Sequence, residues 1–411
     1  MEPTTNKTPL RSRLMLPALL LVSVTIPLAN NLNSIAIILF VITCVIQRPL
    51  KESWEQLKRS RFWVLPFVYF LWLVLTYFWD SSGGFTIKQV EHYAVLFFVP
   101  PALAMIPQIN YKHIKYAGFV FIGITAALCI VSMFKSYNEY KVTGDYRVFY
   151  YHYLSQQVGL NAIFLSNFCL ASVIWLFYFG RNNISLLIKI PVALFLIAMI
   201  FFLSSKMILI LLILSIPAFI IYYIRARKNI VRSVLGLIIF LAAVIISINE
   251  LPYLKWRIFE TKYKEYEGPQ DNQNGLAIRL FMWETGWDLI KERPLQGYGI
   301  KGARIETLDQ YKKKGFELGY EAGYHTHNQY IESTLMGGVI SFVLLLLIIG
   351  MAIWKGFSSD NVLLLVGVIH FAIHSVIEST FEVQQELVFF VFFIFLFYYH
   401  PPKLKMDVAN G

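Results

Sequence analysis

Charged side chains are scarce in this chain, since Asp, Glu, Lys and Arg make up 15% of its 411 residues while 57% are hydrophobic. Such a composition leaves too little polar surface to enclose a water-soluble domain of this length. The apolar runs are continuous, and the alternating ten-residue segments of a membrane β-barrel are missing. In lipid, only helices and closed barrels satisfy every backbone group. The composition therefore predicts an all-α, polytopic integral membrane bundle.

Cysteine is almost absent from the sequence. Cys44, Cys129 and Cys169 fall inside apolar stretches, are odd in number and lack the spacing of metal ligands. They are expected to be packing residues, which argues against a disulfide framework. Motifs for a metal ion or a nucleotide are also missing, so no metal site and no cofactor are predicted. The sequence shows neither an internal repeat nor the inverted halves of many transporters.

Long apolar stretches fill most of the chain, and at about 17–25 residues per span they predict about twelve membrane helices. Lys and Arg cluster in the short loops of one side, which places both termini in the cytoplasm. The net charge of +11 suits anionic lipid on that inner face and gives no reason to expect nucleic acid. The spans are expected near residues 14–29, 32–47, 62–79, 91–107, 114–134, 157–179, 184–203, 206–224, 230–248, 329–354, 361–378 and 385–400.

Three regions follow from this topology. Residues 1–248 hold the first nine spans, residues 249–328 form one large outward loop, and residues 329–411 hold the last three spans and a cytoplasmic tail. Within the loop, apolar side chains recur at helical spacing over residues 276–292, and Pro294 with two following glycines ends the pattern. This predicts an amphipathic helix at the membrane interface, followed by a turn.

The outward loop ends in His325-Thr326-His327-Asn328, directly before a long apolar stretch. It concentrates Arg, Lys, Tyr and two histidines at the entrance of a helix, in a chain that is otherwise mostly apolar. This concentration favours a membrane enzyme over a passive anchor.

Several motifs in and after this loop recur in one order in a known family. That order resembles the signature region of the O-antigen ligase and polymerase superfamily. The motifs are Arg279 and Trp283, then Pro294-x-x-Gly297-x-Gly299, then His327-Asn328-x-Tyr330-x-Glu332, and then Gly337-Gly338 early in the next span.

The resemblance implies a metal-independent membrane glycosyltransferase of the bacterial inner membrane, with its active site facing the periplasm. The donor would be a glycan on undecaprenyl diphosphate, and the ligase acceptor would be lipid A–core. Such a displacement needs a base for the acceptor hydroxyl and cations for the departing diphosphate. His327 is the expected base, because a histidine is neutral at ordinary pH, and Arg279 is the expected clamp. The alternative for His327 is that it only caps the helix or hydrogen-bonds the backbone. The alternative for Arg279 is a contact with lipid headgroups.

Members of the superfamily carry a second basic residue, an arginine, at the outer start of an earlier span, and Lys206 aligns there. Charge at this depth is costly without a partner, which makes Lys206 a candidate in its own right. A lysine keeps the positive charge but loses the two-point geometry of an arginine. The alternative is a lysine that extends to the membrane interface.

Substrate contacts are expected from further polar residues near the outward face. His325 and Asn328 flank the expected base, and Arg147 and His152 belong to a basic and aromatic run before a span, where sugars and phosphates bind. An aromatic belt is the alternative for that run.

Three ionisable residues of the eleventh predicted span, His370, His374 and Glu378, recur every four residues and are expected to share one helix face. Glu378, the outermost, is expected to orient His327 or to hold an acceptor sugar. The stripe is alternatively a metal site, a proton relay or a set of hydrogen bonds to neighbouring helices.

These observations favour an O-antigen ligase. The nearest alternative is a repeat-unit polymerase, which takes a second lipid-linked glycan as acceptor, and a related protein glycosylase also stays open. From a different class, twelve helices with intramembrane His and Glu suit a flippase or secondary transporter.

Overall fold

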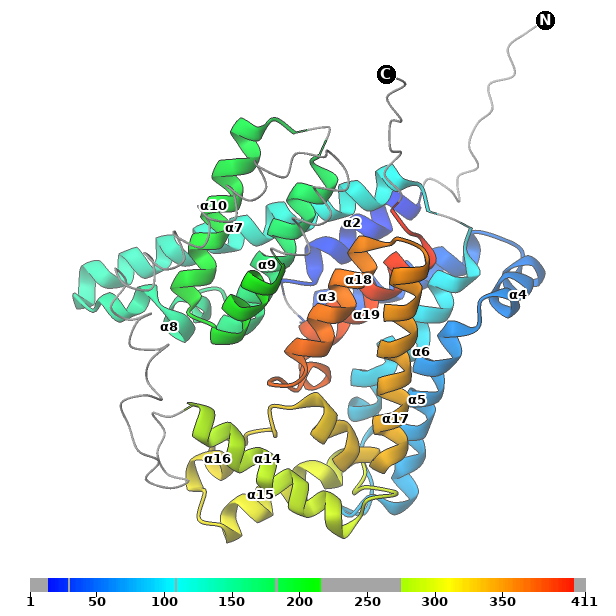
Figure 1. Ribbon diagram of the computed structural model, residues 1–411, viewed down its shortest axis with the longest axis vertical. Helices are drawn as coiled ribbons and strands as arrows, with labels where there is room; N and C mark the ends of the chain where they lie inside the picture. Colours follow the sequence, from blue (N-terminus) through cyan, green and yellow to red (C-terminus); the bar gives the residue numbers. More distant parts are fainter. Residues whose placement is uncertain (1–13, 29, 108, 182–183, 216–274, 403–411) are drawn as a thin grey trace, which may run out of the picture. The chain divides into compact units, whose positions relative to one another are not determined.

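The computed structural model describes residues 14–28, 30–107, 109–181, 184–215 and 275–402. Every regular element in these ranges is a helix, which confirms the all-α prediction (Figure 1). The chain forms two compact units, the first made of residues 1–117 with 279–411 and the second of residues 118–278.

The first unit holds most of the helices. Helices from the N-terminal and C-terminal parts of the chain pack together in it, α19 on α6 and α17 on α5. Aromatic rings fill this core, with Phe40 edge-on to Phe392 at 5.1 Å and Phe62 stacked on Phe395 at 5.0 Å. The helices are α2 (Met15–Thr25), α3 (Asn30–Ile46), α4 (Leu50–Arg59), η1 (Arg61–Trp63), α5 (Val64–Leu75), η2 (Thr76–Trp79), α6 (Ile87–Met105), α14 (Gly275–Glu292, from Arg279 on), α15 (Ile300–Lys313), α16 (Glu317–Glu321), α17 (Gln329–Ser358), α18 (Val362–His374), η4 (Thr380–Glu382) and α19 (Gln384–Tyr399).

The second unit is built around α9, almost every residue of which is buried. Phe121 packs edge-on against Phe168. Cys129 and Cys169 are buried, with their sulfurs 3.4 Å apart, and Cys44 is buried in the first unit. This burial confirms the prediction that the cysteines are packing residues. The helices are α7 (Tyr111–Thr143, mostly in this unit), η3 (Tyr146–Phe149), α8 (Tyr151–Gln156), α9 (Ala162–Phe179), α10 (Leu186–Leu203) and Lys206–Ser215.

The predicted count of about twelve spans is not confirmed. Among the described residues, five helices are long and apolar enough to cross a membrane, or six if the pair Leu32–Ile46 and Leu50–Arg59, bent by 101°, is one span. Four further apolar helices are shorter, including α18 and α19. Of the predicted spans, 206–224 is described only to Ser215, and 230–248 lies outside the described residues, as do residues 249–274 of the predicted outward loop.

Helix α17 is broken near its start, and the break holds the turn that follows α14. Gly338 has a φ of 66° inside α17, so the backbone leaves the helical path there. The freed carbonyl of Leu335 accepts from the N–H of Tyr298 at 2.7 Å, and the N–H of Val339 donates to Pro294 at 2.8 Å. A helix over the predicted range and the turn after it are thus present, and both are fixed to α17. That this helix lies at the membrane interface stays a prediction.

Asp80 fixes the next helix of this region. Its Oδ2 accepts from the backbone N–H groups of Lys301 at 3.0 Å and Gly302 at 3.2 Å, in the first turn of α15. A carboxylate there satisfies N–H groups that lack a helical partner and favourably meets the positive end of the helix dipole. As a result α14, α15 and α16 gather at the end of α17 where that helix begins (Figure 1).

Candidate active site

The segment before α17 places His327 at the entrance of that helix, as its sequence position indicates. Asn328 is the N-cap, and its Oδ1 accepts from the N–H groups of Tyr330 at 3.0 Å and Ile331 at 3.1 Å. His327 takes a left-handed conformation with φ of 48°. Since Oδ1 of Asn328 already accepts these two hydrogen bonds, the substrate contact predicted for this residue would be made by its side-chain amide nitrogen.

Glu378 lies between the two residues predicted to carry the chemistry. Its Oε2 is 3.0 Å from Nδ1 of His327, and its Oε1 accepts from Nη2 of Arg279 at 3.0 Å. The Nε of Arg279 also donates to the carbonyl of Ile377 at 3.4 Å. The Glu378 side chain is 6% exposed, whereas those of His327 and Arg279 are 30% and 24% exposed. The buried carboxylate therefore joins two side chains that solvent still reaches.

This arrangement fixes the charge of Glu378 and the orientation of His327. Burial alone would raise the pKa of Glu378, but the neighbouring His327 and Arg279 outweigh burial and lower the pKa to about 2. An ionised carboxylate beside Nδ1 favours the imidazole form that carries its proton on Nδ1. Within the described residues, Nε2 of His327 makes no hydrogen bond with the protein, so this nitrogen is able to accept a proton.

The predicted stripe of His370, His374 and Glu378 on one helix face is wrong in its outer part. Helix α18 ends at His374, and Glu378 follows in a turn, where it reaches His327. His374 instead binds Glu386 at 2.9 Å, and both of these side chains are completely buried. His370 is buried with its ring edge-on to Phe390. The four-residue spacing of the ionisable residues continues past the end of α18, so the sequence pattern does not show where this helix ends.

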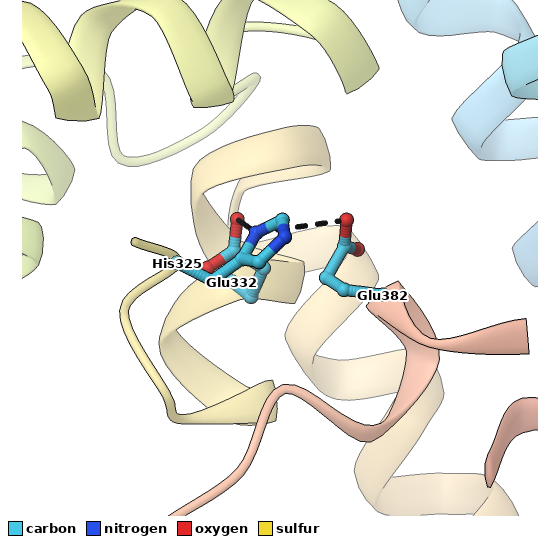
Figure 2. A group of neighbouring side chains, drawn as sticks. All are labelled: His325, Glu332 and Glu382. Atoms are coloured by element: carbon cyan, nitrogen blue, oxygen red, sulfur yellow. Dashed lines mark ion pairs between the residues drawn. The ribbon is translucent and has the colours of Figure 1, made fainter. Parts of the chain in front are cut away.

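His325 lies between two carboxylates (Figure 2). Its Nδ1 is 3.7 Å from Glu332 and 3.8 Å from Glu382. Burial alone would lower the pKa of His325, but the two carboxylates outweigh burial and raise the pKa above its ordinary value. The sequence offered two signals for these partners. Glu332 belongs to the signature motif, and Glu382 lies without a basic neighbour between the predicted spans 361–378 and 385–400.

The other predicted site residues belong to the second unit. Arg147 forms an exposed ion pair with Asp145 at 2.7 Å, and His152 lies on α8 with its ring against Tyr151 at 3.9 Å. Lys206 begins a helix directly after the end of α10, as predicted for the start of a span. Because His327 belongs to the first unit, the approach of Lys206 to it stays a prediction.

Comparison with known proteins points to the same part of the chain. Residues 191–346 match the model of a family described as O-antigen ligase, a range that includes Lys206, Arg279 and His327. Over 76 residues the chain is 29% identical to the exopolysaccharide production protein ExoQ of Rhizobium meliloti, which is 18% of each chain. Over 113 residues it is 32% identical to an uncharacterized protein of Haemophilus influenzae, which is 26% of this chain and 28% of that protein. The chain thus aligns with less than a third of either relative.

Proposed function

Because this chain belongs to the O-antigen ligase superfamily, we propose that it is an O-antigen ligase. It transfers a glycan from undecaprenyl diphosphate to lipid A–core on the periplasmic side of the bacterial inner membrane. The observation that carries this proposal is the contact of one buried carboxylate, Glu378, with both His327 and Arg279.

The proposed reaction is a single displacement at the anomeric carbon of the donor. The acceptor hydroxyl oxygen forms the new bond while the bond to the diphosphate oxygen breaks, and the configuration inverts. The hydroxyl proton passes to Nε2 of His327, and Glu378 stabilises the imidazolium that results. Undecaprenyl diphosphate leaves with the bonding electrons.

Arginine and lysine supply the positive charge in this proposal. Arg279, held by Glu378, binds the diphosphate oxygens as negative charge develops on them, and Lys206 contributes a second positive charge. The step itself uses no metal ion. Asn328, Arg147 and His152 contact the sugars or phosphates of the substrates, whereas His325 faces the carboxylates of Glu332 and Glu382.

A repeat-unit polymerase is the second candidate, because one relative is named for exopolysaccharide production. The chemistry is the same, but the acceptor is another lipid-linked glycan. The hypothesis of a flippase or transporter loses support, since the match to the O-antigen ligase family covers the region in which His327 lies.

The test is glycan transfer in reconstituted vesicles that contain an undecaprenyl-diphosphate oligosaccharide and lipid A–core. We expect transfer by the wild type, and a loss of roughly 100- to 10,000-fold for His327→Ala, which removes the base. Arg279→Ala is also expected to abolish most of the transfer. Arg293→Ala, an exposed arginine just after α14, is the matched control and retains activity.

The product identifies the acceptor. Growth of the lipid-linked glycan without transfer to lipid A–core would show that the protein is a polymerase and not a ligase. Full activity of folded His327→Ala would remove the proposed base, and the absence of any covalent product would favour transport.

A further inference from the structure

A second group of ionisable side chains lies beside the proposed active site. His325 comes from the segment before α17, Glu332 from the first turn of α17 and Glu382 from η4 (Figure 2). One ligand atom from each residue lies within 4.8 Å of the other two. One continuous stretch, residues 325–332, and the distant η4 thus converge on one point.

The distances in this group do not fit hydrogen bonds. Nδ1 of His325 is 3.7 Å from Glu332 and 3.8 Å from Glu382, beyond the reach of a hydrogen bond, and this nitrogen is buried without a hydrogen-bond partner. The carboxylates are 2% and 14% exposed. A buried and a half-buried carboxylate, each with an oxygen within 4.8 Å of the other, are stabilised by a positive charge between them.

The outer oxygen of each carboxylate is already bound. Oε2 of Glu332 accepts from the hydroxyl of Thr326 at 2.7 Å and from its N–H at 3.2 Å. Oε1 of Glu382 accepts from the hydroxyl of Tyr93. Hydrogen bonds of this kind orient the ligands of metal sites. They leave the other oxygen, Oε1 of Glu332 and Oε2 of Glu382, on the side of His325.

We propose that His325, Glu332 and Glu382 bind one divalent cation of the zinc or manganese class. One imidazole nitrogen with two carboxylate oxygens suits these ions. The separations of 3.7 and 3.8 Å are a few tenths of an ångström wider than the roughly 3.4 Å between two ligands of a tetrahedral zinc ion, so small side-chain movements close the site on the ion. The positive charge of Arg304, which also faces His325, weakens the site without removing it.

The bound ion has a positioning role. It ties the segment that carries His327, two residues after His325, to the start of α17 and to η4. The site is separate from the proposed transfer step, which uses no metal, so its existence does not depend on which glycan the protein transfers.

The experiment measures zinc bound to the full-length protein in detergent, without a metal-binding tag and without substrate. After removal of metal by a chelator, the protein is dialysed against ZnCl₂ at several concentrations, and zinc per chain is counted by mass spectrometry. MnCl₂ is tested in the same way. We expect one ion per wild-type chain, and binding at least about tenfold weaker in His325→Ala and Glu382→Gln.

Two further variants make the result decisive. Tyr93→Phe keeps all three ligands but removes the hydrogen bond to Glu382, and should weaken binding by about tenfold. Glu321→Gln changes an exposed carboxylate on α16 and should bind as the wild type does. Wild-type protein that binds neither ion above background, or Glu382→Gln that binds like the wild type, would overturn the proposal and leave a protonated His325 between two carboxylates.

Discussion

The carboxylate of Glu378 holds both residues on which the proposed chemistry depends. It contacts Nδ1 of His327 and Nη2 of Arg279, each at 3.0 Å. The left-handed backbone of His327, at φ of 48°, is uncommon for a residue with a side chain and is held by these contacts and by the cap at Asn328. We infer that Glu378 is a positioning residue.

Glu378→Gln tests this role at the residue level. The amide keeps the shape of the side chain but cannot stabilise an imidazolium, so glycan transfer should fall by at least about tenfold, mainly in kcat. Glu378→Asp should recover part of the activity. Transfer kinetics in vesicles measure both, and an unchanged kcat in Glu378→Gln would show that the carboxylate only supports the fold.

The same carboxylate makes the stability of the protein depend on pH. His327 and Arg279 hold the pKa of Glu378 at about 2, below the ordinary value of 4.5. The folded state therefore gains stability that is complete above about pH 5 and is lost as the pH falls toward 2. That pKa difference is worth about 3 kcal/mol. The melting temperature of the wild type in detergent should exceed that of Glu378→Gln near neutral pH, and the gap should close in acid.

At the level of elements, the two glycine motifs of the signature region form one structural unit. The turn between α14 and α15 enters the break in α17, where Tyr298 and Gly299 donate to the carbonyls of Leu335 and Met336. A Cβ on Gly338 would collide with the carbonyl of Leu295. The motifs are therefore explained by close backbone contact, which fixes α14, the helix of Arg279, to the helix that begins beside His327.

Gly338→Ala should destabilise the protein by roughly 1–3 kcal/mol, because its φ of 66° and the contact with Leu295 both oppose a side chain. The matched control is Gly350→Ala on the same helix, where an added Cβ meets nothing within 4 Å. That control should be neutral or slightly stabilising. Thermal unfolding in detergent compares the two, and equal melting temperatures would contradict the proposed role of the break.

For the whole molecule, the proposed function requires α14 to α16 and the start of α17 to face the periplasm. Exposed positions on opposite sides of the predicted topology are available, with Glu321 on α16 and Lys58 on α4. The three native cysteines are buried, so the background of thiol labelling is low.

Labelling of cells with a membrane-impermeant thiol reagent tests this orientation. The reagent, admitted through a permeabilised outer membrane, should modify Glu321→Cys in intact cells and Lys58→Cys only after lysis. The reverse pattern would place the proposed site in the cytoplasm and exclude a periplasmic ligase. Labelling of neither variant before or after lysis would show that these positions are not accessible and would contradict the exposed surfaces of α4 and α16.

Much of the site could be predicted because its residues belong to a recognisable motif. The candidates His327 and Arg279 and the helix over residues 276–292 follow from local spacing and from the resemblance to the superfamily. The role of Glu378 was expected, but its place on the face of a helix was wrong, because periodicity does not show that α18 ends at His374. The contact of His374 with Glu386 on α19 agrees with the alternative of hydrogen bonds to neighbouring helices, but Glu386 was not predicted as the partner.

The sequence by itself determined the all-helical, membrane-associated character of the protein, because apolar content and helix length are local properties of the chain. Only the tertiary structure decided which distant side chains meet. Glu378 reaches both Arg279 and His327, and Glu382 joins His325 and Glu332, from segments about fifty to a hundred residues apart along the chain. Such contacts depend on how turns and helices pack together, and neither periodicity nor motif order encodes that packing.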